Sequence, residues 1–216
     1  MSKSSEKALM YSVGCGDVRA MKHLMDKYLD LVSRTAFRIL CDRKDSEAVT
    51  QDVFINAWNY AAAFDGSVSL DAWLLHHTCR YARMRIVRRR IMYIFGERPD
   101  LFVTTAQKAP EFDDYITKQA WELYCRISVD MSVTHRILFT LCILEGISEN
   151  DASQITGISR RRISGLITSA ESKFRKELIR LGCSDDYYRY IGFLRRVAEG
   201  FTEHDKLKRM IMASVR

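Results

Sequence analysis

Arginines are the side chains in this sequence best placed to do chemistry, and they gather in two short clusters. The first cluster spans residues 80–90 and contains Arg80, Arg83, Arg85, Arg88, Arg89 and Arg90. The second consists of three consecutive residues, Arg160, Arg161 and Arg162. Guanidinium groups present several donors in a planar fork that matches phosphate oxygens, and cation clusters of this kind follow nucleic-acid backbones. The alternative is an ordinary solvated basic face.

The first arginine cluster lies in the second half of a predicted helix over residues 69–90. Ser69 precedes the helix and is a favourable N-cap residue. Apolar or aromatic side chains then recur at spacings of three and four, which places them on one face of a helix. They are Leu70, Trp73, Leu74, His77, Tyr81, Met84, Val87 and Ile91.

The second cluster opens the longer helix of a predicted helix-turn-helix within Ser148–Lys176. Ser148 and Asp151 form a variant capping box before a short helix, and Gly157 supplies a tight turn. A longer helix follows from Ser159 with apolar residues at core spacing. Cations in the first turn oppose the helix dipole by roughly 0.3–1 kcal/mol each. In this motif that turn enters the major groove of DNA, so the arginines favour DNA contact over mere surface charge.

Composition and charge predict an all-α chain with two small helical domains joined by a linker. The 216 residues include only 2 prolines and 10 glycines, and the formal net charge is +7. Residues 64–99 hold seven basic and three acidic side chains, and residues 148–181 hold seven and four. Between them, residues 100–147 hold four basic and seven acidic side chains. Two basic blocks around an acidic stretch indicate two surfaces that meet a polyanion.

The predicted division places the first domain at 1–95, the linker at 96–111, the second domain at 112–182 and a helical extension at 183–216. Both prolines fall in the linker. The first domain holds helices from Asp17 to about residue 40 and from Asp42 or Asp45 to about residue 62. The second holds helices to about residue 127 and over 132–146, before the helix-turn-helix. Two further helices, over 185–198 and from 202, are expected in the extension.

Catalytic, metal-binding and membrane functions are not expected. The six cysteines are scattered without CxxC spacing and are typical of small buried residues in a reducing compartment. The five histidines form no metal-ligand spacing, and we expect no metal and no other cofactor. The N-terminus lacks the apolar core of a signal peptide, and no apolar run has the length of a membrane span. We therefore expect a cytoplasmic protein that is not an enzyme and does not insert into a membrane.

Together these motifs resemble the extracytoplasmic-function sigma factors of the sigma-70 superfamily. The segment Asp45–Trp58, followed by Phe64-Asp-Gly, Trp73-Leu and the first arginine cluster, is similar to region 2 of that family. Residues 148–176, with Gly-Ile-Ser at 157–159, resemble region 4. The likeness covers about residues 17–95 and 112–181, and the extension lies outside it. The first motif is fairly specific, whereas the second is shared with many helix-turn-helix regulators.

The resemblance implies two partners, core RNA polymerase and promoter DNA. Docking on the polymerase clamp helices would involve Glu47, Gln51, Asp52 and Asn56. The loop 64–69 would capture an unstacked non-template base of the minus-10 element, and the second helix of region 4 would read the minus-35 element. The implied DNA-binding residues are Asp65, Gly66, Ser67, Arg80, Arg83, Arg88, Arg89, Arg160, Arg161, Arg162, Ser164, Thr168, Ser169 and Lys173. Family members are also often held inactive by an anti-sigma factor.

One departure from the family lies in the predicted recognition helix. Its middle reads Ser164-Gly-Leu-Ile-Thr-Ser169 where relatives often carry basic residues, and Gly165 costs the helix up to about 1 kcal/mol relative to alanine. Two alternatives to a sigma factor stay open. The chain could be a free-standing helix-turn-helix regulator, or a helical adaptor whose basic surfaces bind an acidic protein. The free-standing regulator would leave the Asp45–Trp58 motif and the arginine helix unexplained.

Overall fold

The computed structural model describes residues 3–94, 115–180, 187–197 and 204–215, and every regular element within them is helical. The expectation of an all-α fold is confirmed. The elements of the N-terminal half are α1 (Lys3–Gly14), α2 (Val18–Leu40), α3 (Arg43–Asn59), the short 3₁₀ turn η1 (Ala61–Ala63) and α4 (Leu70–Ile94). Those of the C-terminal half and tail are α6 (Tyr115–Asp130), α7 (Val133–Leu138), the π-helical turn η2 (Phe139–Leu144), α8 (Glu149–Thr156), α9 (Arg160–Arg180), α10 (Tyr187–Arg196) and α11 (His204–Ser214).

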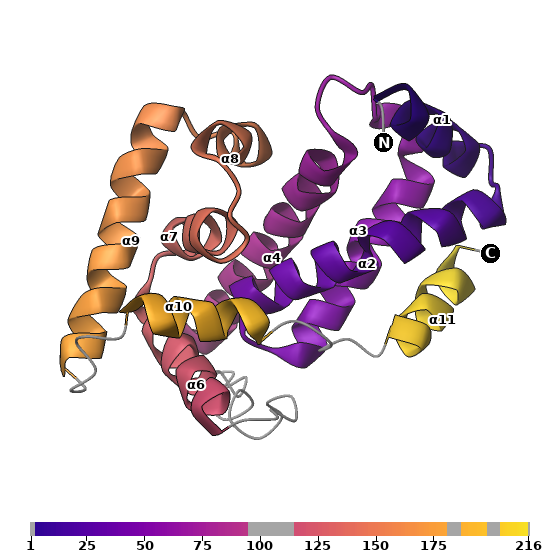
Figure 1. Cartoon of the computed structure of the whole chain (residues 1–216). Coiled ribbons are helices and arrows are strands. Elements are labelled where there is room, and N and C mark those ends of the chain that lie inside the picture. The colour runs from indigo at the N-terminus through magenta and orange to yellow at the C-terminus, as the bar shows by residue number, and fades with distance from the viewer. Residues whose placement is uncertain (1–2, 95–114, 181–186, 198–203, 216) are drawn as a thin grey trace.

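Helices α2, α3 and α4 form the bundle of the N-terminal half (Figure 1). The predicted caps are found where expected: the Asp17 carboxylate accepts from the Arg19 and Ala20 amides, and Asp42 accepts from the Asp45 amide. Of the two cap residues considered for the second helix, Asp42 is therefore the one used. That helix ends at Asn59 rather than near residue 62, because the chain tightens into η1.

Helix α1 was not predicted from the sequence, although it helps to build the N-terminus of α4. Glu6 is buried, and its carboxylate accepts a hydrogen bond from the Leu70 amide at 3.1 Å. The predicted cap is also present, since the Ser69 hydroxyl accepts from the Ala72 amide at 3.2 Å. Two oxygens thus satisfy amides that the first turn of a helix leaves unpaired.

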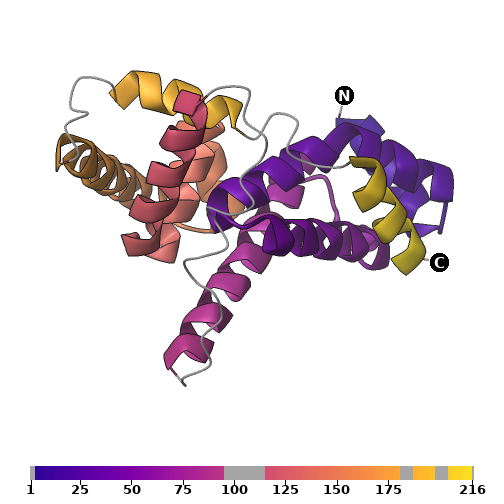
Figure 2. The ribbon, with the colours of Figure 1, turned by 90° about the horizontal axis from the view of Figure 1, so that it is seen from below.

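The apolar face predicted for α4 is only partly buried. Leu70 and Leu74 are 0% exposed, but Met84, Val87 and Ile91 are 56%, 43% and 49% exposed. In the second half of the helix the buried side chains are instead Cys79, Ala82 and Ile86. Met84, Val87 and Ile91 are exposed because the C-terminal end of α4 extends beyond the rest of the bundle (Figure 2).

The C-terminal half packs α6, η2, α9 and α10 around Trp121, Tyr124, Phe139 and Phe174, which are all at most 1% exposed. A smaller cluster joins α7, α8 and α9 through Leu138, Ala152, Ile163 and Ile167. The expected cap at Ser148 is present, with its hydroxyl accepting from the Asp151 amide at 3.1 Å. Gly157 ends α8 at a φ of 71°, as the predicted turn requires. The helix expected over 132–146 is divided, because its second part adopts the wider π turn. The linker expected at 96–111 lies outside the described residues.

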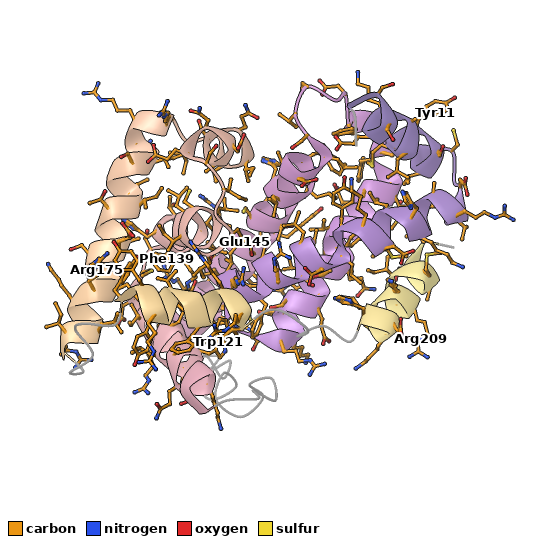
Figure 3. All side chains as sticks on the ribbon, viewed as in Figure 1. Tyr11, Trp121, Phe139, Glu145, Arg175 and Arg209 are labelled. Atoms are coloured by element: carbon orange, nitrogen blue, oxygen red, sulfur yellow. The ribbon has the colours of Figure 1, made fainter. Side chains whose placement is uncertain are left out.

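The two halves share packed surfaces as well as polar contacts. Phe37 of α2 stacks on Trp121 of α6 with ring centroids 4.4 Å apart, and Ile137, Leu141 and Ile155 join the core of the N-terminal half. Glu145, labelled in Figure 3 between the halves, accepts hydrogen bonds from Arg34 and Arg38. The described residues therefore place the predicted domains in direct contact.

Candidate nucleic-acid and partner surfaces

The loop expected to bind an unstacked base is exposed and held in a defined turn. The Ser67 amide donates to the Asp65 carboxylate at 2.8 Å, and Gly66 has a φ of 74°. Hydrogen bonds from the Ser67 hydroxyl and amide lower the pKa of Asp65. A β-carbon at Gly66 would lie 2.3 Å from the Lys7 Cε of α1, so a larger residue would displace the Lys7 side chain, and the positive φ favours glycine here.

Aromatic side chains anchor this loop to α4. Phe64 is buried, and its ring meets that of Trp73 edge to face at 5.9 Å. Trp73 in turn contacts His77, with ring centroids 4.3 Å apart. Burial, with smaller effects of His76 and Arg80, lowers the pKa of His77 to about 4. A neutral His77 thus belongs to the aromatic support of the loop.

The arginines of α4 divide into a paired and an exposed group. Arg89 lies 2.5 Å from Asp45 and 3.3 Å from Asp42, and Arg85 lies 3.3 Å from Asp52. These pairs join α4 to α3. Burial raises the pKa of Asp45 despite the nearby Arg89 and Arg85 guanidinium groups.

The remaining predicted contacts on α4, Arg80, Arg83 and Arg88, are exposed. They offer their charges to solvent or to a ligand. Arg89 is the predicted DNA contact whose charge is already engaged within the protein, so a phosphate would have to compete with Asp42 and Asp45 for it.

The second basic cluster lies at the N-terminus of α9. Arg160, Arg161 and Arg162 are exposed, and Arg160 makes only a long 3.7 Å pair with Glu149. The buried face of α9 carries Ile163, Ile167, Ala170, Phe174 and Leu178.

The other predicted contacts on α9 lie mostly on its outer face. Ser164, Thr168 and Lys173 are exposed, whereas Ser169 is partly buried. The Thr168 hydroxyl donates to the Ser164 carbonyl at 3.0 Å, so it is already occupied within the helix. Among the residues that the structure describes, no atom outside the helix lies within 4 Å of a β-carbon built on Gly165, so this position faces open space.

The two arginine clusters face a common cleft between the halves. Arg80 and Arg83 of α4 and Arg162 of α9 line a cavity of about 410 Å³ together with His76 and Thr156. The His76 Nδ1 and the Ile155 carbonyl oxygen are 2.7 Å apart across the same boundary. Figure 1 shows α8 between α9 and α4. The structure thus brings together residues that the sequence assigned to different DNA elements.

The four residues expected to contact polymerase do not form one patch. Glu47 pairs with Arg43 of the same helix at 2.9 Å. The Gln51 amide donates to the Ser214 hydroxyl of α11 at 3.0 Å. Asp52 and Asn56 lie on the other flank of α3, where they line a groove against α4.

This α3–α4 groove, which the sequence reasoning missed, has a volume of about 940 Å³ and is predominantly apolar. Its lining includes Tyr60, Met84, Val87, Ile91 and Met92, of which the first four are exposed. An exposed apolar patch with a polar rim is typical of a protein-binding surface. The signal was present in the α4 stripe, which continues for almost five turns from Leu74, its last buried member, to Ile91.

No helix in the described ranges is long and apolar enough to cross a membrane. Likewise, no group of three or more potential metal-ligating side chains occurs among these residues.

The geometry defines an all-helical protein with an exposed turn, two basic clusters and an open apolar groove. Residues 24–91, which run from within α2 to near the end of α4, match the family described as sigma-70 region 2. This segment therefore carries a sigma-70 region 2 match, as the motifs between Asp45 and the first arginine cluster led us to expect. The match contains the loop, the first arginine cluster and the groove.

Two individual proteins are also similar to this chain. The chain is 26% identical to the RNA polymerase sigma-H factor of Pseudomonas aeruginosa over 113 residues, which are 52% of this chain and 55% of that protein. The match thus spans about half the length of this curated relative. The fold also resembles that of CnrH, solved in complex with the cytosolic domain of CnrY, with a TM-score of 0.59 and 19% identity. That likeness covers 81% of this chain and 97% of CnrH, and it concerns the fold.

Proposed function

We propose that this protein is a sigma factor of the extracytoplasmic-function type, which binds core RNA polymerase and directs promoter recognition and melting in the cytoplasm. The single observation that carries the proposal is the sigma-70 region 2 match over residues 24–91. Within it, α3, an exposed loop and an arginine-bearing α4 follow one another in the order that such a role needs. The protein would act without catalytic residues or a cofactor of its own.

Promoter melting is assigned to the loop of residues 64–69 and to α4. The exposed Asp65 and Ser67 offer polar groups to the edge of an unstacked base, and the nearby Trp73 is partly exposed. Arg80, Arg83 and Arg88 offer free cations to the adjoining phosphates. Contacts to the DNA phosphates position the strand, and the loop would recognise the base.

Recognition of the upstream promoter element is assigned to α8 and α9 as a helix-turn-helix. The exposed arginines at the start of α9 would meet phosphates and base edges in the major groove. The outer face of α9 carries only short side chains at Ser164 and Thr168, so we expect the arginines to provide most of the affinity.

Polymerase binding is assigned to the α3–α4 groove and to the α3 ridge, which we define by the half-buried residues Gln51, Asp52 and Asn56. A protein partner is favoured there because the groove is lined by apolar side chains from two helices. The same surface is open to an anti-sigma factor, a class of partner that the resemblance implies, and CnrH has been solved with CnrY bound.

Run-off transcription tests the whole proposal. The purified protein, added to core polymerase and a library of promoter fragments, is expected to direct initiation at a defined set of start sites. Core polymerase alone is the control. Duplex DNA binding without any sigma-dependent initiation would favour the free-standing regulator, and it would leave the groove without a role.

A further inference from the structure

The C-terminal helix α11 packs on the N-terminal half, whereas α10, the helix before it in sequence, packs on the C-terminal half. Figures 1 and 2 both show α11 beside α2 and α3, whereas α10 packs against α6 in the C-terminal half. The tail therefore spans both halves. No motif in the sequence assigned a function to this extension.

Helix α11 is seated by an apolar face and two polar contacts. Leu207 is 2% exposed and Ile211 0% exposed, and both belong to the core cluster of the N-terminal half. The Lys208 ammonium lies 2.6 Å from the Asp26 carboxylate of α2, and this hydrogen bond lowers the pKa of Asp26. At the far end of the helix, Ser214 accepts the hydrogen bond from Gln51.

The contact with Gln51 places α11 on the helix that the proposed function assigns to polymerase. Gln51 lies on one flank of the α3 ridge, and Asp52 and Asn56 lie on the other flank. A helix with its side chains is about 10–12 Å across. A partner that docks on the ridge and reaches Gln51 must therefore meet α11.

The contact surface that holds α11 on α2 and α3 is small enough for a partner to displace the helix. It consists of one face of an 11-residue helix, and the Lys208–Asp26 pair is exposed to 31% and 62%. Exposed ion pairs contribute little to stability. Specific protein interfaces, in contrast, bury on the order of 1,600 Å², so a large partner has more to gain from the ridge than α11 has.

We propose that α11 is a built-in competitor that occupies the α2–α3 side of the polymerase-docking surface until core polymerase displaces it. The inference rests on the proposed function, because it names a regulation of the same surface. It gives the extension a role that the shared region 2 and region 4 patterns do not contain.

The test uses full-length variants that release α11. Leu207→Asp combined with Ile211→Asp removes the apolar seat, and Met210→Asp on the exposed side of the same helix is the matched control. Hydrogen exchange of the α11 amides reports whether the helix is seated, independently of polymerase. Fluorescence anisotropy with core polymerase reports the affinity.

The release variant is expected to lose amide protection in α11 and to bind core polymerase more tightly. If the ridge is free in about one molecule in ten, full release raises the apparent affinity about tenfold. Met210→Asp should match the wild type in both readouts. A released helix with unchanged or weaker polymerase binding would overturn the proposal, as would α11 amides that are unprotected in the wild type.

Reversing the charges of the Lys208–Asp26 pair provides a second test in case the release variant folds poorly. Lys208→Glu places a second acid against Asp26 and is expected to tighten polymerase binding by a smaller factor. Adding Asp26→Lys restores an opposite-charge pair and should return the affinity toward the wild-type value. If neither the wild type nor any variant binds core polymerase, the proposed function itself fails and the competitor role falls with it, while hydrogen exchange still records the seat of α11.

Discussion

Arg38 of α2 and Glu145 between η2 and α8 form a buried ion pair across the two halves, with Nη1 and Oε1 2.6 Å apart. Each side chain is only 3% exposed. Arg34 also donates to Glu145 at 3.0 Å, and a second Arg38 nitrogen donates to the Arg195 carbonyl of α10. One carboxylate therefore joins α2 to the C-terminal half, while Arg38 also contacts the tail.

Glu145→Gln is expected to destabilise the whole structure. Removing one partner of a buried pair leaves an uncompensated charge and costs about 3–5 kcal/mol. Urea denaturation of the variant and the wild type measures the difference in the free energy of unfolding. Glu177→Gln, which breaks the exposed Arg180–Glu177 pair, is the control and should cost at most about 1 kcal/mol. A cost for Glu145→Gln as small as this would mean that the halves are not held together through the buried pair.

Arg160→Ala combined with Arg162→Ala is expected to weaken promoter binding while leaving polymerase binding intact. The two side chains are exposed at the start of α9 and make no contact with the α3–α4 groove. Each lost phosphate contact should also lower the salt slope of DNA binding by about one. Gel-shift titrations at several salt concentrations measure both effects.

Arg180→Ala, at the opposite end of α9, serves as the control for these DNA titrations. It should change neither the affinity nor the salt slope, because Arg180 lies far from the proposed DNA-binding turn. Equal loss of DNA and polymerase binding in the double variant would contradict the division of labour between the two halves.

Met84→Asp combined with Val87→Asp is expected to reduce core-polymerase binding by about tenfold or more without unfolding the protein. Both side chains are already exposed in the groove, so the free chain loses little burial, but an interface must then desolvate two carboxylates at a cost of several kcal/mol. Ile179→Asp, an equally exposed apolar position on α9, is the control. Unaltered affinity of the groove variant would remove the groove from the docking surface.

His77 predicts a pH dependence of folding. Its pKa is lowered to about 4 in the folded protein, whereas an unfolded histidine titrates near 6.5. Between these values the unfolded chain binds the extra proton, so stability is fully present above about pH 6.5 and falls as the pH drops toward 4. His77→Phe keeps a ring beside Trp73 and should remove this part of the slope. Denaturation curves across the range measure it, and parallel slopes for variant and wild type would refute the assignment.

Local signals predicted most of the helices, because caps and turns depend on neighbouring residues. The predicted helix ends are found at Asp17, Asp42, Ser148 and Gly157. The first three side chains accept hydrogen bonds from backbone amides two or three residues further on, and Gly157 ends α8. Helix α1 was missed because nothing in the polar segment that begins the chain gave a comparable signal.

Contacts between residues far apart in sequence could not be predicted. Arg38 reads as one more surface cation near the end of a helix, yet its partner lies 107 residues away. Arg89 was grouped with the other arginines of α4, although acids at the start of α3 pair with it. The seat of α11 depends on Gln51 and Ser214, which are 163 residues apart. Such pairings require the tertiary structure.

The central claim is tested most directly by gel filtration of the protein with core RNA polymerase. The full-length chain is expected to co-elute with the enzyme. Asp52→Ala combined with Asn56→Ala, which leaves the hydrogen bond between Gln51 and Ser214 of α11 in place, is expected to reduce or abolish co-elution. Absence of the wild-type protein from the polymerase peak, with duplex DNA binding retained, would contradict the account and favour a regulator that acts without polymerase.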